Sequence, residues 1–358
     1  MDEVFKGLGV SHENLDAYLT DVIPEFEQLG AVTKFSTGQS NPTYRLDAAS
    51  GVYVLRSKPP GRLLPSAHAV DREFRVMQAL AGTDVAVPEV LHLTDAQGSP
   101  SRRAFFVMRY LPGRIFWDPA VPDMPNPDRT AIYDAMNASL AALHDVDVGS
   151  VGLADFGRPG NYFVRQLDRW SRQYLSSVTD PSDAMVEIMN WLGANMPADD
   201  GAVSLVHGDW RLDNMIFDAE RPQIAGILDW ELATLGHPMA DLAYQCMQWR
   251  LPNQGDMRGL DGVDRAAFGL PSESNYVADY ARRRGLGPVE NWAFYLVFAI
   301  FRLAAILAGV AVRANAGNAS NPAMARKYGA AVPALAAMAT IIIHEGPDDN
   351  RVSVAGER

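Results

Sequence analysis

The spacing of apolar and polar positions changes along the chain. Residues 31–58 alternate between the two and are rich in β-branched and aromatic side chains, which is typical of a small antiparallel sheet. Strands are predicted at 31–35, 43–46 and 52–56. A helix is predicted at 66–80 and another strand at 105–110. The N-terminal part of the chain therefore reads as a compact α+β unit.

From residue 128 onward, apolar residues recur at helical spacing. One β-like patch interrupts this region, with short strands predicted at 205–207, 215–217 and 224–228. The chain has 358 residues, which exceeds the size at which one hydrophobic core usually stops growing, so two lobes are expected. Further helices are predicted at 162–178, 181–194, 238–250, 274–284, 291–314 and 322–344.

One predicted helix is apolar enough to resemble a membrane span. Residues 292–312 are nearly all apolar, and their length would cross a bilayer. Arg302 lies at the middle of this segment, where a charge is costly in lipid. We therefore expect a buried helix of a large helical lobe and no membrane association.

Composition excludes several classes of function. The net charge of −12 is unfavourable for nucleic-acid binding. Cys246 is the only cysteine, which rules out an intrachain disulfide and a cysteine-based zinc site. The N-terminus has no basic segment followed by an apolar run, so a secretory signal is not expected. These features favour a cytoplasmic protein.

A group of polar residues in the second half carries candidate chemistry. Residues 207–214, HGDWRLDN, have the form H-x-D-x-x-x-x-N, and Asp229 follows fifteen positions after Asn214. Phosphoryl transfer needs a carboxylate that orients the attacking hydroxyl and accepts its proton, and it needs oxygen ligands for Mg²⁺. Asp209, Asn214 and Asp229 can supply both. Glu231, near Asp229 in the sequence, is expected to have only a supporting role.

The spacing of Asn214 and Asp229 adds a geometric prediction. The segment between them has the pattern of a hairpin whose turn lies within 218–222. Residues equidistant from a hairpin turn face each other in an antiparallel pair. The midpoint of 214 and 229 falls in that turn, so the two residues should meet at the open end, to within a residue or two.

The sequence resembles the aminoglycoside phosphotransferase family, a branch of the protein-kinase-like fold. Within that family, it most resembles the kinase-like domain associated with certain acyl-CoA dehydrogenases. It implies an α+β fold with a sheet-rich N-terminal lobe at 1–110, a hinge at 111–113 and a helical C-terminal lobe at 114–358. The segments that carry the resemblance are FSTGQSNPT at 35–43, YVLR at 53–56, KPPG at 58–61, HGDWRLDN at 207–214 and LDWELATLGHPMADLA at 228–243.

In the second half, the resemblance implies that Asp209 is the catalytic base and that Asn214 and Asp229 bind Mg²⁺. Arg211 matches a position that contacts phosphate in many kinases, although a structural ion pair is the alternative. Asp241 matches a buried carboxylate that supports the backbone of the catalytic loop.

In the first half, the resemblance implies a strand cation that binds phosphate, at Arg56 or, with a shifted register, at Lys58. Glu73 falls within the apolar arc of the helix at 66–80, and a carboxylate on a buried face needs a partner. The kinase-like reading supplies that partner in Arg56. The loop at 38–42, with Ser40, matches the phosphate loop but has a single glycine. The stretch 107–113, with Met108 and Tyr110, matches the segment whose backbone holds adenine.

These assignments predict a kinase that uses ATP and Mg²⁺ and phosphorylates a hydroxyl of a small molecule. The resemblance implies a hydroxyacyl-CoA or another hydroxylated metabolite as acceptor, and a functional link to an acyl-CoA dehydrogenase. An aminoglycoside-type antibiotic kinase, a catalytically silent ATP-binding module and a hydrolase of ATP are the alternatives. The sequence does not indicate an oligomeric state.

Overall fold

The computed structural model describes residues 3–35, 41–60, 69–255, 257–315, 327 and 329–347. The chain forms two compact units. The first comprises Met1–Ile115, Val151–Leu153 and Asn214–Ala233, and the remaining residues form the second. The assignment of lobes and hinge to function stays a prediction.

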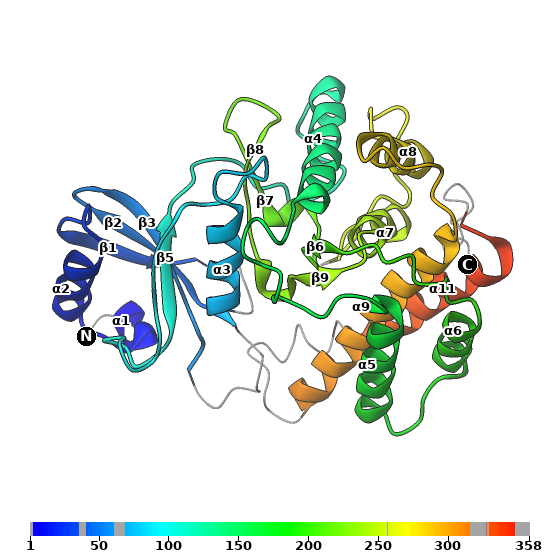
Figure 1. The fold of residues 1–358 in the computed structure, drawn as a ribbon, viewed down its shortest axis with the longest axis horizontal. Helices are drawn as coiled ribbons and strands as arrows, with labels where there is room; N and C mark the ends of the chain where they lie inside the picture. Colours follow the sequence, from blue (N-terminus) through cyan, green and yellow to red (C-terminus); the bar gives the residue numbers. More distant parts are fainter. Residues whose placement is uncertain are drawn as a thin grey trace. The chain divides into compact units, whose positions relative to one another are not determined.

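The first unit is built on a five-stranded antiparallel sheet with the order β1-β2-β3-β5-β4 (Figure 1). The strands at 31–35, 43–46, 52–56 and 105–110 are confirmed with small shifts of their ends, whereas β4 was not predicted. The strands are β1 (Leu29–Lys34), β2 (Thr43–Ala48), β3 (Gly51–Ser57), β4 (Val90–Thr94) and β5 (Phe105–Arg109).

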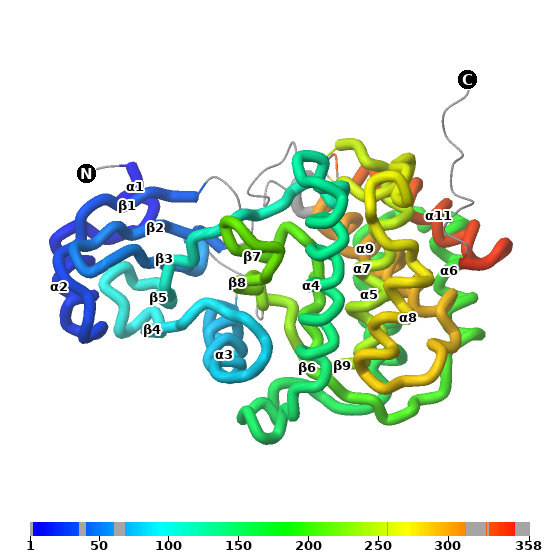
Figure 2. Tube along the Cα trace, turned by 90° about the horizontal axis from the view of Figure 1, so that it is seen from above, coloured from blue at the N-terminus to red at the C-terminus, as the bar shows by residue number. Residues whose placement is uncertain are grey.

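Helices cover both faces of this sheet (Figures 1 and 2). Helices α1 (Glu3–Leu8) and α2 (His12–Val22) pack with β1 and share an apolar core with Tyr53 and Leu55 of β3. Helix α3 (Val70–Leu80) packs against β4 and β5. Because successive side chains of a strand point to opposite faces, Val54 and Arg56 point away from the α1–α2 core.

A short hairpin, β7 (Met215–Phe217) and β8 (Ile224–Ile227), belongs to the same unit. The chain that leaves β5 is bound to it, since the amide of Arg114 donates to the carbonyl oxygen of Phe217 at 2.8 Å. Gly113 permits this approach, because a Cβ atom there would lie only 2.2 Å from the same oxygen. The hairpin is followed by the 3₁₀ turn η2 (Trp230–Leu232).

The second unit is mainly helical, as the spacing of apolar residues predicted. Its short strands β6 (Ser204–Val206) and β9 (Thr234–Gly236) pair with each other, and β9 was not predicted. The 3₁₀ turn η3 (Gln248–Arg250) also belongs to this unit, and η1 (Leu212–Asn214) spans the point in the sequence where the chain passes into the first unit. The helices are α4 (Asn126–Asp145), α5 (Tyr162–Ser177), α6 (Asp183–Ala194), α7 (Met239–Met247), α8 (Glu273–Arg283), α9 (Trp292–Asn315) and α11 (Val332–Glu345).

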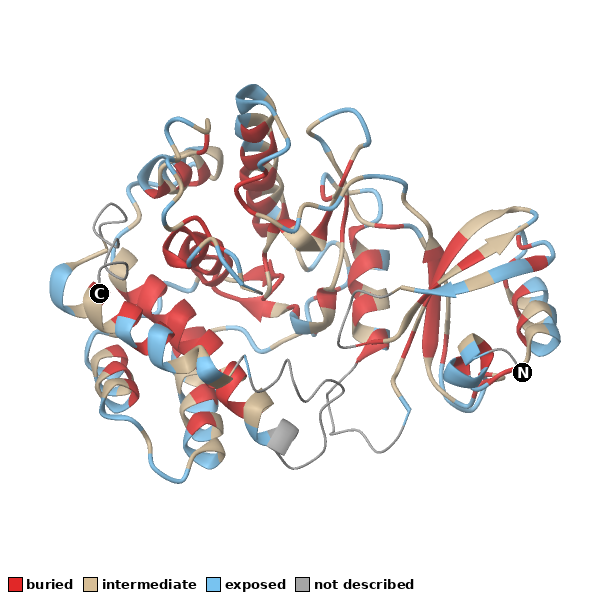
Figure 3. Ribbon diagram, turned by 180° about the vertical axis from the view of Figure 1, so that it is seen from behind, coloured by how far each residue is buried: buried red, intermediate tan, exposed pale blue. Residues whose placement is uncertain are grey.

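Helix α9 forms the centre of this unit. It packs against α5, α6, α7 and α11, and Figure 3 shows most of it, and all of α7, as buried. Trp292–Val312 is long and apolar enough to cross a membrane, but 78% of its most apolar window is buried inside the protein. The segment is therefore a core helix of the second unit, as its central arginine suggested.

Candidate active site

Arg56, at the end of β3, bridges two carboxylates in the first unit. Its Nε lies 2.9 Å from Oε2 of Glu73 on α3, and its Nη2 lies 2.7 Å from Oδ1 of Asp229. The predicted ion pair between Arg56 and Glu73 is therefore confirmed. Burial alone would lower the pKa of Arg56, but Glu73 and Asp229 outweigh it and raise the pKa above its usual value.

The alternative cation, Lys58, has a different partner. Its Nζ lies 3.7 Å from Oδ1 of Asp71 on α3, and the side chains of Lys58 and Asp71 are 32% and 60% exposed. Arg56, and not Lys58, is therefore the strand cation that pairs with the buried carboxylate of Glu73. Whether Arg56 also binds phosphate stays a prediction.

Glu73 is only 1% exposed, in agreement with its place in the apolar arc of α3. Besides Arg56, it accepts a hydrogen bond of 2.8 Å from Nδ2 of Asn41. Burial, and then the neighbouring charges of Asp229 and Glu231, raise the pKa of Glu73 against the opposing influence of Arg56. The site therefore holds more negative charge than one guanidinium neutralises.

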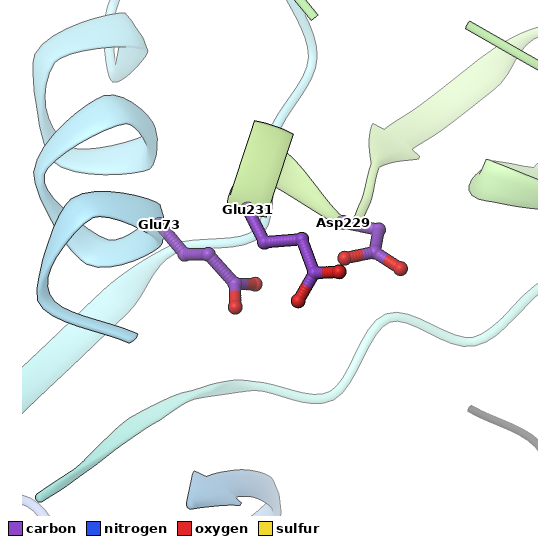
Figure 4. A group of neighbouring side chains, drawn as sticks. All are labelled: Glu73, Asp229 and Glu231. Atoms are coloured by element: carbon purple, nitrogen blue, oxygen red, sulfur yellow. The ribbon is translucent and has the colours of Figure 1, made fainter. Parts of the chain in front are cut away.

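Glu231 is the member of this cluster to which the sequence analysis gave only a supporting role. Ligand atoms of Glu73, Asp229 and Glu231 all lie within 4.8 Å of one another, and Figure 4 shows the three carboxylates facing a common space. Nδ2 of Asn41 also lies 3.5 Å from Oε2 of Glu231. The sequence signal that could have identified Glu231 is its position two residues after Asp229, which places it within the turn η2.

The hairpin places Asn214 beside Asp229, as predicted. Met215 pairs with Ile227, and the amide of Leu228 donates to the carbonyl oxygen of Asn214 at 2.8 Å. Asn214 thus lies opposite Leu228, one position from Asp229. The backbone of Asp229 is left-handed, with φ 63° and ψ 58°, a conformation that is uncommon outside glycine and occurs often at functional sites.

Asp209 and Arg211 belong to the second unit, on the loop between β6 and η1. Gly208 precedes Asp209 with φ 85°, a conformation that favours glycine. The carboxylate of Asp241, on α7, accepts the amides of His207 at 2.6 Å and Gly208 at 2.8 Å. These contacts confirm that Asp241 supports the loop backbone.

Arg211 forms a bidentate pair with Asp213. Its Nε and Nη2 lie 2.9 Å and 3.0 Å from the two carboxylate oxygens. Burial would lower the pKa of Arg211, but Asp213 and Asp209 raise it above its usual value. In this arrangement Arg211 stiffens the loop, and contact with phosphate stays a prediction.

The assigned nucleotide residues Met108 and Tyr110 lie on or next to β5. Met108 pairs with Val54 of β3, and its side chain is buried. The amide of Tyr110 donates to the carbonyl oxygen of Val52 at 3.2 Å, so this amide is already used by the sheet. Their role in holding adenine stays a prediction. Ser40 lies outside the described residues.

Comparison with known proteins identifies the family. The model of the phosphotransferase enzyme family matches residues 31–286. Mouse acyl-CoA dehydrogenase family member 10 is 41% identical over 342 residues, which make up 94% of this chain and 31% of the mouse protein. This chain therefore spans about a third of that relative's length. The predicted similarity to kinase-like domains associated with acyl-CoA dehydrogenases is confirmed.

Solved structures agree with this assignment. A Ralstonia eutropha protein, provisionally assigned as an aminoglycoside phosphotransferase, is 43% identical with a TM-score of 0.82, over 92% of this chain and 97% of its own. A mutant of aminoglycoside phosphotransferase APH(4)-Ia, in ternary complex with AMP-PNP and hygromycin B, is 16% identical with a TM-score of 0.57, over 90% and 98% of the two chains. The α+β, protein-kinase-like fold is thereby confirmed, and the chain belongs to the phosphotransferase enzyme family.

Proposed function

We propose that this protein is a kinase that transfers the γ-phosphoryl group of ATP to a hydroxyl of a small molecule, with Asp209 as the base. The observation that carries the proposal is the bridge that Arg56 makes between Glu73 and Asp229. A strand cation paired with a helix glutamate, near a carboxylate that can bind metal, is the arrangement by which kinases position a nucleotide. Nucleotide use is further supported by the AMP-PNP complex of APH(4)-Ia.

The proposed step conserves atoms and charge. The acceptor oxygen forms a bond to the γ-phosphorus while the bond from that phosphorus to the β,γ-bridging oxygen breaks, and ADP leaves. The proton of the acceptor hydroxyl moves to the carboxylate of Asp209. Because the reaction needs little covalent help from the protein, its rate depends on positioning and on stabilising charge.

The donor set in the first unit suits magnesium. Oxygen ligands are what Mg²⁺ prefers, and Asp229 and Glu231 offer carboxylate oxygens at the end of the hairpin where Asn214 also lies. When bound, the ion would neutralise charge on the phosphates. Arg56 would then orient the phosphates, and Glu73 would hold Arg56 in place.

For the acceptor, we propose a hydroxyacyl-CoA or a related hydroxylated metabolite. Support comes from the match of 94% of this chain to part of an acyl-CoA dehydrogenase family member. A kinase acting next to such an enzyme would convert a hydroxyl into a phosphate ester. An aminoglycoside is the second candidate, because the Ralstonia eutropha protein carries that provisional assignment.

An assay of ADP release with a panel of acceptors tests both parts of the proposal. The panel comprises hydroxyacyl-CoAs, aminoglycosides, choline and sugars. Asp209→Asn should retain binding of a non-hydrolysable ATP analogue with magnesium and lose turnover by about a hundredfold or more, the scale expected for a positioned base. Asp229→Asn should also weaken the magnesium-dependent binding.

Asp180→Asn, at an exposed position before α6, is the matched control and should behave like the wild type. Wild-type turnover in Asp209→Asn with a true acceptor would contradict the mechanism. Release of ADP that is equal with and without every acceptor would instead indicate a hydrolase. Nucleotide binding without turnover on any acceptor would favour a silent module.

A further inference from the structure

One face of helix α7 contacts the loop that carries Asp209, both at the loop backbone and at the Asp209 side chain. Asp241 and Tyr244 are three residues apart on α7, so they project from the same face. Asp241 accepts the amides of His207 and Gly208. The hydroxyl of Tyr244 hydrogen-bonds to the carboxylate of Asp209 itself.

Tyr244 is buried, with 5% of its surface exposed, and two arginines lie close to it. The guanidinium of Arg302, on α9, lies 5.5 Å from the centre of the tyrosine ring, and Arg211 on the loop also acts on the phenol electrostatically. Arg302 donates a hydrogen bond of 2.8 Å to the carbonyl oxygen of Gly208. The guanidinium in the middle of the apolar helix α9 therefore contacts the backbone of the residue that precedes Asp209.

The protonation state of Tyr244 fixes the direction of its hydrogen bond. Burial, followed by the negative charge of Asp209, raises the pKa of Tyr244 well above the usual value, although Arg211 and Arg302 oppose this. The phenol remains protonated across the working pH range. It therefore donates to the carboxylate, which has no proton of its own to give when it acts as a base.

We propose that Tyr244 is a positioning residue for Asp209. This inference rests on the proposed kinase function. The phenol donates its hydrogen bond to one oxygen of the Asp209 carboxylate and thereby fixes the orientation of that carboxylate. The other oxygen can then receive the proton of the acceptor hydroxyl as the new oxygen–phosphorus bond forms and ADP leaves. Asp241 and Arg302 hold the loop backbone on which this orientation depends.

The test uses Tyr244→Phe in the full chain, which removes the hydroxyl and keeps the ring next to Arg302. Losing one hydrogen bond to a charged group should lower kcat by about tenfold or more. The KM for ATP should stay unchanged.

Tyr174→Phe is the control for loss of a buried hydroxyl, since Tyr174 is a buried tyrosine on α5 whose hydroxyl accepts the amide of Ser182. It should leave both kcat and the KM for ATP unchanged. If Asp209→Asn abolishes turnover while Tyr244→Phe matches the wild type in kcat, the positioning role is wrong and the kinase mechanism stands. If Asp209→Asn also retains turnover, the proposed function itself fails, and the positioning role fails with it.

A second measurement needs no acceptor. Asp209→Ala, Tyr244→Phe and the double variant are compared by urea unfolding, each against the wild type. A hydrogen bond between the two side chains predicts that the double variant shifts the unfolding midpoint by less than the sum of the single shifts. Strict additivity would overturn the proposed contact.

Discussion

Nη2 of Arg56 lies 2.7 Å from Oδ1 of Asp229, although 173 positions of the sequence separate the two residues. The contact joins the end of β3 to the end of the β7–β8 hairpin within the first unit. Because the same guanidinium also pairs with Glu73, each side chain in this group depends on the other two for its charge balance.

The first prediction concerns the geometry of this cation. Arg56→Lys keeps the charge but cannot bridge two carboxylates with a planar fork, so we expect weaker nucleotide binding with the fold retained. Arg56→Met leaves Glu73 buried without its cation and should cost about 3 kcal/mol of stability. Urea unfolding and a titration with an ATP analogue would measure both effects. Lys58→Met, which breaks only a partly exposed pair, should change stability by less than about 1 kcal/mol.

The second prediction concerns the left-handed backbone of Asp229. Alanine tolerates this conformation poorly and glycine adopts it freely, so Asp229→Gly should be more stable than Asp229→Ala by about 1 kcal/mol. Both variants lose the carboxylate, so the comparison isolates the backbone. Equal unfolding midpoints in urea would show that the backbone relaxes there at no cost.

The third prediction concerns the close approach at Gly113. A Cβ atom there would lie 2.2 Å from the carbonyl oxygen of Phe217, so Gly113→Ala must displace the main chain and should cost about 2 kcal/mol. Gly193→Ala is the matched control, because Gly193 lies in α6 with open space around it. That variant should gain about 0.5–1 kcal/mol from helix propensity. Thermal unfolding of the two variants should therefore shift in opposite directions.

The fourth prediction concerns pH. Burial lowers the pKa of His144 in spite of its contact with Asp241. An unfolded histidine has a pKa of about 6.5, so below that pH the unfolded chain binds a proton that the folded protein does not. Stability should therefore fall as the pH drops from about 6.5 to 5, by up to about 1.4 kcal/mol per pH unit for this residue.

Asp241 affects the pH dependence of stability at lower pH than His144 does. Burial raises the pKa of Asp241, but the hydrogen bond and charge of His144, then His207 and the amide of Gly208, hold the pKa below its usual value. That stabilisation is present above about pH 4 and is lost only in stronger acid, so the window between pH 5 and 6.5 reports on His144. In that window, urea unfolding of His144→Gln should show a shallower pH dependence than His344→Gln, at an exposed position. Equal slopes would contradict the assignment.

The placement of several site residues in the first unit could be predicted, because it depends on the repeat of a single helix or hairpin. Glu73 fell in the apolar arc of its helix, and that arc is the buried face of α3. The distance of Asn214 and Asp229 from one turn fixed their pairing to within one residue. In both cases the repeat of a helix or a strand sets which side chains share a face, and a repeat can be read along the sequence.

Other parts depended on how separate elements pack. The sequence left Arg56 and Lys58 as alternatives, and the packing of α3 beside the sheet decided that Arg56 meets Glu73. Glu231 joined the cluster only through the turn η2 and its approach to α3. Neither result follows from spacing, because the rotation of one element against another is set by side-chain packing.

The sequence by itself determined the motif around Asp209, the α+β character and the buried helix with one central arginine. Tertiary structure decided what that arginine does: α9 brings Arg302 to the carbonyl oxygen of Gly208, 94 positions away in the sequence. It likewise brought Tyr244 of α7 to Asp209. A buried charge or hydroxyl needs a partner, so the sequence can show that one must exist. The partner's identity depends on which distant segments fold against each other.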